Sequence, residues 1–150
     1  MTPSPSGWAN TSPGEQAPAR PADAFSAAGA AAFAVFSEQA WDWAMATGDT
    51  SLVRAVSDPD CSDCSDFADL VEQDVADGMR YVGGRVVLRG PATLDSPLSV
   101  AGTAVTVPIS AGEWSVYDAA GNPYGDPQPA REVDDQRTLV WRSDRWWVAG

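Results

Sequence analysis

The sequence predicts an α+β domain in which three N-terminal helical segments pack on a curved, mainly antiparallel sheet of four to six strands. Apolar residues recur with a helical period between residues 23 and 77, and from residue 85 onward they recur with a period of two. Because the helices precede the strands and do not alternate with them, this pattern is typical of α+β folds. A chain of 150 residues, 44% of them hydrophobic, is long enough for one core.

A disordered tether is predicted for residues 1–22, ahead of a single domain over residues 23–150. Five of the 12 prolines lie in this segment, and Ser, Thr, Gly and Ala fill most of its other positions. Trp8 is the exception in composition. We interpret it as an isolated exposed aromatic side chain, with a partner-binding anchor as the alternative.

The first helix is predicted from residue 23 to Gly48, where glycine supplies the stop. With about 3.6 residues per turn, its apolar positions fall within an arc of about 120° and form one face. These positions are Phe25, Gly29, Ala32, Phe33, Phe36, Ala40, Trp43 and Ala44. Asp42 points away from this face, and we expect it to be solvated.

Two further helices are predicted before the sheet. Asp49 or Thr50 caps a short helix that extends through Val56. The run Asp58-Pro59-Asp60 places a capping carboxylate before a proline at the first helical position. The third helix is therefore expected to begin there and to run as far as Gly78, which ends it.

Four β-rich runs follow, at residues 85–89, 103–109, 113–117 and 137–148. Residues 121–129 are rich in turn-forming residues and are expected to form a long loop. The last run predicts a hairpin with a defined register. If Ser143-Asp144 forms a two-residue turn, Trp141 lies opposite Trp146 and Leu139 opposite Val148, so that one face is apolar.

The composition excludes several classes of function. The net charge is -12, with nine Arg and no Lys, which disfavours nucleic acid and anionic membrane surfaces as partners. The sequence contains no run of about 20 apolar residues, which is the length that a helix needs to span a bilayer. The chain has no histidine, which removes Ser-His and Cys-His nucleophile pairs and the commonest zinc ligand. No export leader follows Met1, so either the protein is cytoplasmic or its leader has been removed.

Cys61 and Cys64 are predicted to form a structural disulfide at the start of the third helix. Both sulfurs share the apolar face with Phe67 and Val71, so they point toward the core. A redox-active pair is the alternative, but the acidic neighbours oppose thiolate formation and no strand precedes the motif. A metal site is disfavoured too, because zinc would lack two ligands and a calcium loop would lack its Gly and its bidentate Glu.

Glu113 is the candidate general base of an enzymatic alternative, since a carboxylate in a pocket can act without histidine. An unbroken strand would place Glu113 on the inner face with Ile109. A bulge at Gly112 would instead turn Trp114 and Val116 inward and leave Glu113 outside. We favour the bulge, because it buries the two apolar side chains.

The expected ligand site is a cavity between the long first helix and the concave face of the sheet. Aromatic side chains are the candidates for its lining, although core packing explains each of them equally well. The candidates are Phe33, Phe36, Trp43, Trp114, Trp141 and Trp146.

Three stretches carry a family resemblance: residues 44–50 (Ala-Met-Ala-Thr-Gly-Asp-Thr), residues 57–64 with their Asp-Pro-Asp-Cys-x-x-Cys core, and the ending Arg-Trp-Trp-Val at 145–148. They resemble an uncharacterised family of actinobacterial surface lipoproteins with a nuclear-transport-factor-2-like, or cystatin-like, α+β cone domain. The likeness covers residues 23–150. It implies a missing leader that ended in a lipid-modified cysteine, with residues 1–22 as the tether to the domain. It assigns no catalytic residue.

Residues and resemblance together predict an extracytoplasmic, membrane-tethered, non-enzymatic module that binds a small apolar ligand or a protein partner. The alternative is a cone-fold enzyme of the isomerase or dehydratase type that uses Glu113 or another inward carboxylate as its base. That alternative rests on analogy of fold. No cofactor, metal or catalytic residue is predicted.

Overall fold

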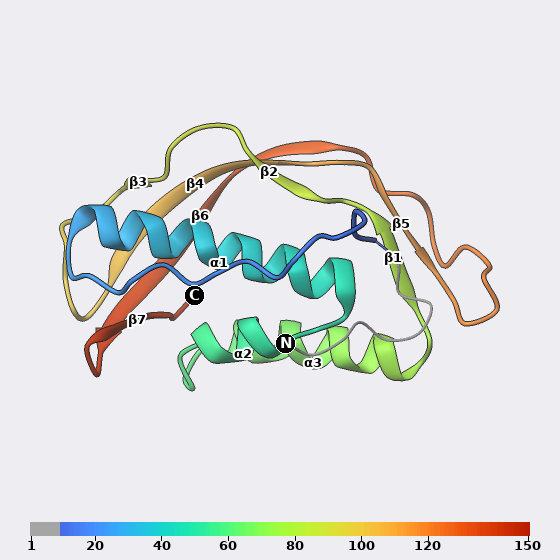
Figure 1. The fold of residues 1–150 in the computed structure, drawn as a ribbon, viewed down its shortest axis with the longest axis horizontal. Coiled ribbons are helices and arrows are strands. Elements are labelled where there is room, and N and C mark those ends of the chain that lie inside the picture. The colour runs from blue at the N-terminus through green and yellow to red at the C-terminus, as the bar shows by residue number, and fades with distance from the viewer. Residues whose placement is uncertain (1–9) are drawn as a thin grey trace.

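A long helix beneath an arched antiparallel sheet dominates the fold (Figure 1). The computed structural model describes residues 10–150, so the prediction for Trp8 lies outside the described residues. The helices are α1 (Ala27–Thr47), α2 (Ser51–Val56) and α3 (Ser62–Ala76). The strands are β1 (Arg80–Gly83), β2 (Val86–Leu88), β3 (Thr93–Leu94), β4 (Thr103–Ala111), β5 (Trp114–Tyr117), β6 (Arg131–Arg142) and β7 (Arg145–Val148). The predicted α+β class with three helices ahead of an antiparallel sheet is confirmed.

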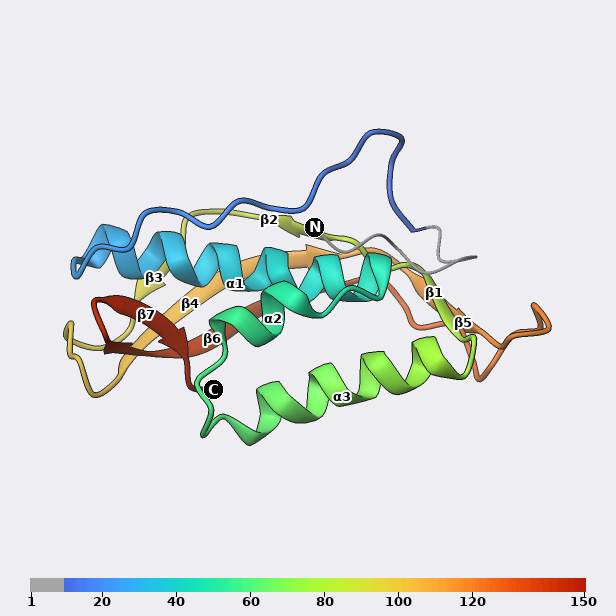
Figure 2. The same ribbon diagram turned by 60° about the horizontal axis from the view of Figure 1, so that its bottom comes forward.

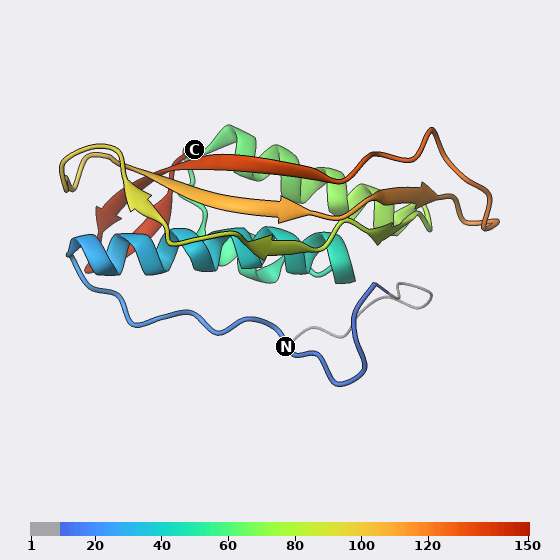
Figure 3. The same ribbon diagram turned by 90° about the horizontal axis from the view of Figure 1, so that it is seen from above.

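The strands form two antiparallel sheets. The larger sheet has the order β2-β4-β6-β7 with β3 also paired to β4, and the smaller one pairs β1 with β5. Figure 3 shows β4 and β6 running along the length of α1. Figure 2 shows α2 next to α1, with α3 beyond it. All three helices therefore lie on one side of the larger sheet, with the β1-β5 pair at one end.

The ends of the helices follow their capping residues. The Ser26 side chain accepts a hydrogen bond from the Gly29 amide at the start of α1, and Gly48 ends the helix with φ 77°. The start of α3 was predicted wrongly. Asp58 accepts the Asp60 amide through its side chain and forms a turn, so the helix begins at Ser62, later than the Asp-Pro-Asp signal indicated.

The C-terminal hairpin has the predicted register. Trp141 lies opposite Trp146, and Leu139 lies opposite Val148. The turn residues Ser143 and Asp144 both have positive φ, 56° and 59°, as a two-residue hairpin turn of the primed type requires. The strand β6 begins at Arg131, six residues before the predicted start, because β4 pairs with it as far as Ala111. The short strands β1 and β3 were not predicted.

Residues 10–22 lie alongside the domain and form no helix or strand. Asn10 pairs with the backbone of Gly83, because its Nδ2 donates to the Gly83 oxygen at 2.8 Å and its Oδ1 accepts from the Gly83 nitrogen at 2.9 Å. Further along, Arg20 donates to the Trp146 oxygen at 2.9 Å and lies over the ring of Phe33 at 4.8 Å. The part of the expected tether that the structure describes therefore contacts the domain at both ends.

Candidate functional site

A pocket of about 280 Å³ lies between α1 and the concave face of the sheet. Helix α1 forms one wall, strands β4 and β6 form the opposite wall, here called the floor, and the β1-β5 pair closes one end. Its main apolar lining consists of Trp41, Phe67, Tyr81, Ile109, Trp114 and Val133. Charged side chains also face it, so the pocket combines an aromatic wall with buried polar groups.

The most buried charged pair in the pocket is Glu38 on α1 with Arg137 on β6. The Arg137 Nε donates to Glu38 Oε1 at 2.9 Å, and the two residues are only 4% and 9% exposed. The pKa of Glu38 is raised to about 7, chiefly by burial and next by the neighbouring Asp135 carboxyl group, while Arg137 acts in the opposite direction. Glu38 is therefore an inward carboxyl group that can change its protonation state near neutral pH.

The Arg137 guanidinium is held from two sides. Its central carbon lies 4.3 Å from the ring centroid of Trp41, in a cation-π contact. The Asp135 carboxylate on the same strand lies 3.7 Å from its Nε. The aromatic ring and the Glu38 hydrogen bond hold the guanidinium in place within the pocket.

A second ion cluster closes the rim of the pocket. Arg85 bonds to Asp42 at 2.9 Å and to Glu15 at 2.5 Å, and it also donates to the Asn10 oxygen at 3.0 Å. The Asp42 carboxylate accepts the Val86 amide as well, at 3.0 Å. The expectation that Asp42 is solvated was wrong, because Arg85 reaches it from the start of β2. The hydrogen bond from Arg85 lowers the pKa of Glu15.

Of the predicted aromatic lining, Trp114 lies in the pocket. Phe33, Phe36 and Trp146 are buried at 1%, 2% and 0% exposure in the core between α1 and the sheet. Trp43 is buried on α1, and Trp141 packs edge-on against Trp146 with ring centroids 5.1 Å apart. The pocket lies farther along α1 than this aromatic core, at its C-terminal half.

Glu113 is exposed and does not line the pocket. The extended strand is interrupted at Gly112 and Glu113, where the chain leaves β4 in one sheet and enters β5 in the other. After this break Trp114 faces the pocket and meets Tyr81 edge-on, with ring centroids 6.0 Å apart. The inward carboxylate is Glu38, on the helix and not on the strand.

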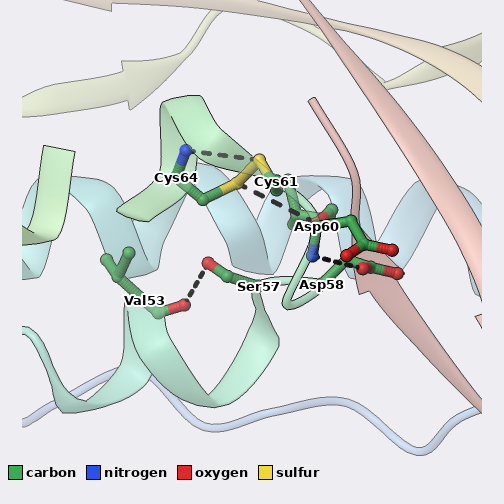
Figure 4. The surroundings of a disulfide bond; sticks show 7 residues. Val53, Ser57, Asp58, Asp60, Cys61 and Cys64 are labelled. Atoms are coloured by element: carbon green, nitrogen blue, oxygen red, sulfur yellow. Dashed lines mark hydrogen bonds between the residues drawn. A yellow bond between two sulfur atoms is a disulfide. The ribbon is translucent and has the colours of Figure 1, made fainter. Parts of the chain in front are cut away.

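Cys61 and Cys64 form a disulfide with sulfurs 2.09 Å apart, as predicted (Figure 4). Both residues are buried, at 4% and 3% exposure, and they belong to the core beneath α1. The Cys61 sulfur caps α3 by accepting the Cys64 amide at 3.2 Å. Figure 4 also shows the turn in which Asp58 accepts the amide of Asp60. The disulfide lies outside the pocket lining.

Sequence reasoning missed Glu38, Asp42, Arg85 and Arg137. A signal for the first two existed, because α1 carries few polar residues and is buried on most sides. A helix that is apolar all round lies in the interior. Two carboxylates four residues apart on such a helix share a face and need buried partners. Nothing local marks Arg85 or Arg137 as those partners.

The described residues narrow the chemistry of the site. Within residues 10–150, no group of three or more Cys, Asp or Glu side chains is arranged to hold a metal ion. Among the helices of this part, none is long and apolar enough to cross a membrane. The pocket offers one carboxyl group near its midpoint of titration, one fixed guanidinium and an aromatic wall, which suit binding or proton transfer.

Comparison with known proteins places the chain in a family. No curated protein sequence matches it. The solved structures include a similar fold, the intermembrane space region of the chloroplast protein ARC6. That likeness has a TM-score of 0.56 and 16% identity, and it covers 83% of this chain and 93% of the other. The sequence matches the DUF6318 family over residues 12–150, and the protein therefore belongs to this family of unknown function.

Proposed function

We propose that the protein is a non-enzymatic binding module that holds a small, largely apolar ligand in the pocket between α1 and the sheet. The observation that carries this proposal is the aromatic wall of a pocket of about 280 Å³. Small-molecule sites are typically concave, mostly apolar and about 300–1,000 Å³ in volume, with a few polar groups that orient the ligand. The pocket lies near the lower end of that range, so its ligand is small.

We infer further that the module works outside the cytoplasm, attached to the membrane by a lipid anchor. The Cys61–Cys64 disulfide supports the compartment, because such bonds persist in oxidising surroundings. The resemblance to actinobacterial surface lipoproteins supports the anchor, and the long helix under an arched sheet supports their nuclear-transport-factor-2-like cone. The test is the gene upstream of residue 1. An encoded export leader that ends in a lipid-attachment cysteine supports the anchor, and a gene that encodes no such leader contradicts it.

The sequence provides a direct probe of the pocket. Ile109 is the only isoleucine of the chain and lies on the pocket floor. Met45 lines the same pocket, whereas Met79 does not. Protein labelled with ¹³C at the Ile δ1 and Met ε methyl groups is titrated with the neutral probe 3-phenylpropan-1-ol. We expect saturable shifts at Ile109 and Met45 with Met79 unchanged, and no shift at any soluble concentration would contradict the proposal.

A second candidate function is a cone-fold enzyme with an inward carboxylate as general base. Glu38 favours it, since a carboxyl group with a pKa of about 7 in a pocket suits proton abstraction at neutral pH. The test is exchange of α-protons for deuterium in a β,γ-unsaturated ketone. Exchange that is catalysed by the wild type and lost in Glu38→Gln supports the enzyme, and exchange at the buffer rate with both proteins contradicts it.

A further inference from the structure

Arg137 is largely buried, and its guanidinium group is only partly paired with other side chains of residues 10–150. It has five N–H donors, of which Nε–H bonds to Glu38. Among residues 10–150, no acceptor forms a hydrogen bond with its Nη1 or Nη2. The residue is only 9% exposed and lines the pocket. Neither Nη atom is among the buried nitrogens of residues 10–150 that lack a partner, so solvent in the pocket reaches both, and an acceptor that enters the pocket can replace that solvent.

The other two arginines of the pocket, Arg85 and Arg131, do not offer free donors in its interior. All three guanidinium nitrogens of Arg85 are bonded, to Glu15, Asp42 and the backbone of Asn10. Arg131 lines the same pocket but is exposed at its rim. Among the three arginines that line the pocket, the inner donors that remain for a ligand therefore belong to Arg137.

We propose that the pocket binds a small amphipathic carboxylate whose two oxygens accept the Nη donors of Arg137 and whose apolar body lies against Trp41, Tyr81 and Trp114. This inference rests on the proposed function and names its ligand class. The planar fork of a guanidinium matches the two oxygens of a carboxylate. The contact with Trp41 and the hydrogen bond to Glu38 already hold the guanidinium in place for the ligand.

The charges around the pair limit the ligand to a single negative charge. Glu38 faces Arg137 and Asp135 on β6, and Asp42, one turn farther along α1, is neutralised by Arg85. The net charge of the whole chain is -12, so a polyanion would be repelled. A monoanion fits beside Arg137 if the Glu38 carboxyl group is neutral.

Binding of such a ligand takes up a proton on Glu38. The pKa of this group is about 7 in the free protein, and a second carboxylate beside it raises the pKa further. By linkage, affinity is constant below the free pKa and falls as pH rises from there toward the pKa of the complex, by up to about tenfold per pH unit. A neutral ligand of the same shape lacks this dependence.

The test compares 3-phenylpropionate with 3-phenylpropan-1-ol by calorimetry on the full chain at pH 6, 7, 8 and 9. We expect the carboxylate to bind more tightly than the alcohol at pH 6 and to lose at least about fivefold in affinity by pH 9. The Glu38→Gln variant should bind the carboxylate with an affinity independent of pH. The Arg137→Gln variant should bind the two probes equally, whereas the control Arg54→Gln, which removes an arginine outside the pocket, should keep the preference.

Each outcome separates the inference from the proposed function. Equal, pH-independent binding of both probes to the wild type overturns the carboxylate and leaves the apolar site standing. Binding of neither probe contradicts the proposed function itself. The same pH dependence in Glu38→Gln as in the wild type also overturns the inference, because the proton would bind elsewhere. If Arg137→Gln does not fold, Arg137→Lys, which keeps the charge and loses the fork, should weaken the preference for the carboxylate.

Discussion

Glu38 makes the stability of the protein depend on pH in an unusual direction. Its pKa is raised from 4.5 to about 7 in the folded protein. Between these values the folded state holds a proton that the unfolded state has lost, so the free energy of unfolding falls as pH rises. With about 1.4 kcal/mol per pKa unit, this loss amounts to roughly 2 to 3 kcal/mol between pH 5 and pH 8.

The Glu38→Gln variant isolates this contribution, because glutamine has a similar shape and does not titrate. Urea unfolding followed by tryptophan fluorescence gives the free energy of unfolding of both proteins at pH 5, 6, 7 and 8. We expect the variant to gain roughly 2 to 3 kcal/mol relative to the wild type from pH 5 to pH 8. Titrating groups that do not contact Glu38 cancel in this difference, and the chain has no histidine. A difference that stays constant over this range would refute the reasoning.

The remaining predictions concern the disulfide and the ion cluster at the rim. Replacing Cys61 and Cys64 with alanine should cost about 2 kcal/mol in urea unfolding, because the cross-link closes only a short loop; an unchanged midpoint would mean that no bond forms. Asp42→Asn should cost about 1 to 3 kcal/mol, since Arg85 loses the negative charge and one of the two oxygens that it binds at a half-buried site. The control Asp134→Asn, in an exposed pair, should cost less than about 0.5 kcal/mol. Glu15→Gln removes the ion pair with Arg85 and should speed amide hydrogen exchange at residues 10–20, with the rest of the domain unchanged. Equal exchange rates at residues 10–20 in the variant and the wild type would contradict this prediction.

Local patterns predicted the regular parts of the fold. The end of α1 at Gly48 and the register of the β6-β7 hairpin follow from glycine at a helix end and from apolar alternation around a two-residue turn. The start of α3 was predicted too early, because Asp-Pro-Asp is equally compatible with a turn before a helix. The extension of β6 back to Arg131 depends on its pairing with β4, which is a long-range contact.

The candidate site was less accessible to sequence reasoning, because its polar residues come from distant segments. The residues of the Glu38–Arg137 pair are 99 positions apart, and those of the Asp42–Arg85 pair are 43 apart. Trp114 reaches the pocket because the strand is interrupted at Gly112 and Glu113. Unbroken alternation would have placed Glu113 there, and the apolar pair Trp114 and Val116 favoured the interruption. The available signal was the presence of two carboxylates on a helix that is otherwise mostly apolar. The Asp42 carboxylate was instead expected to be solvated, because it points away from the main apolar face.

The most direct test of the account is the ¹³C signal of the Ile109 δ1 methyl group during a titration with 3-phenylpropionate. This single isoleucine lies on the floor of the pocket. The account predicts a saturable shift at pH 6 that needs higher ligand concentrations at pH 9 in the wild type, but equal concentrations at both pH values in Glu38→Gln. An Ile109 signal that does not move at pH 6 would contradict it.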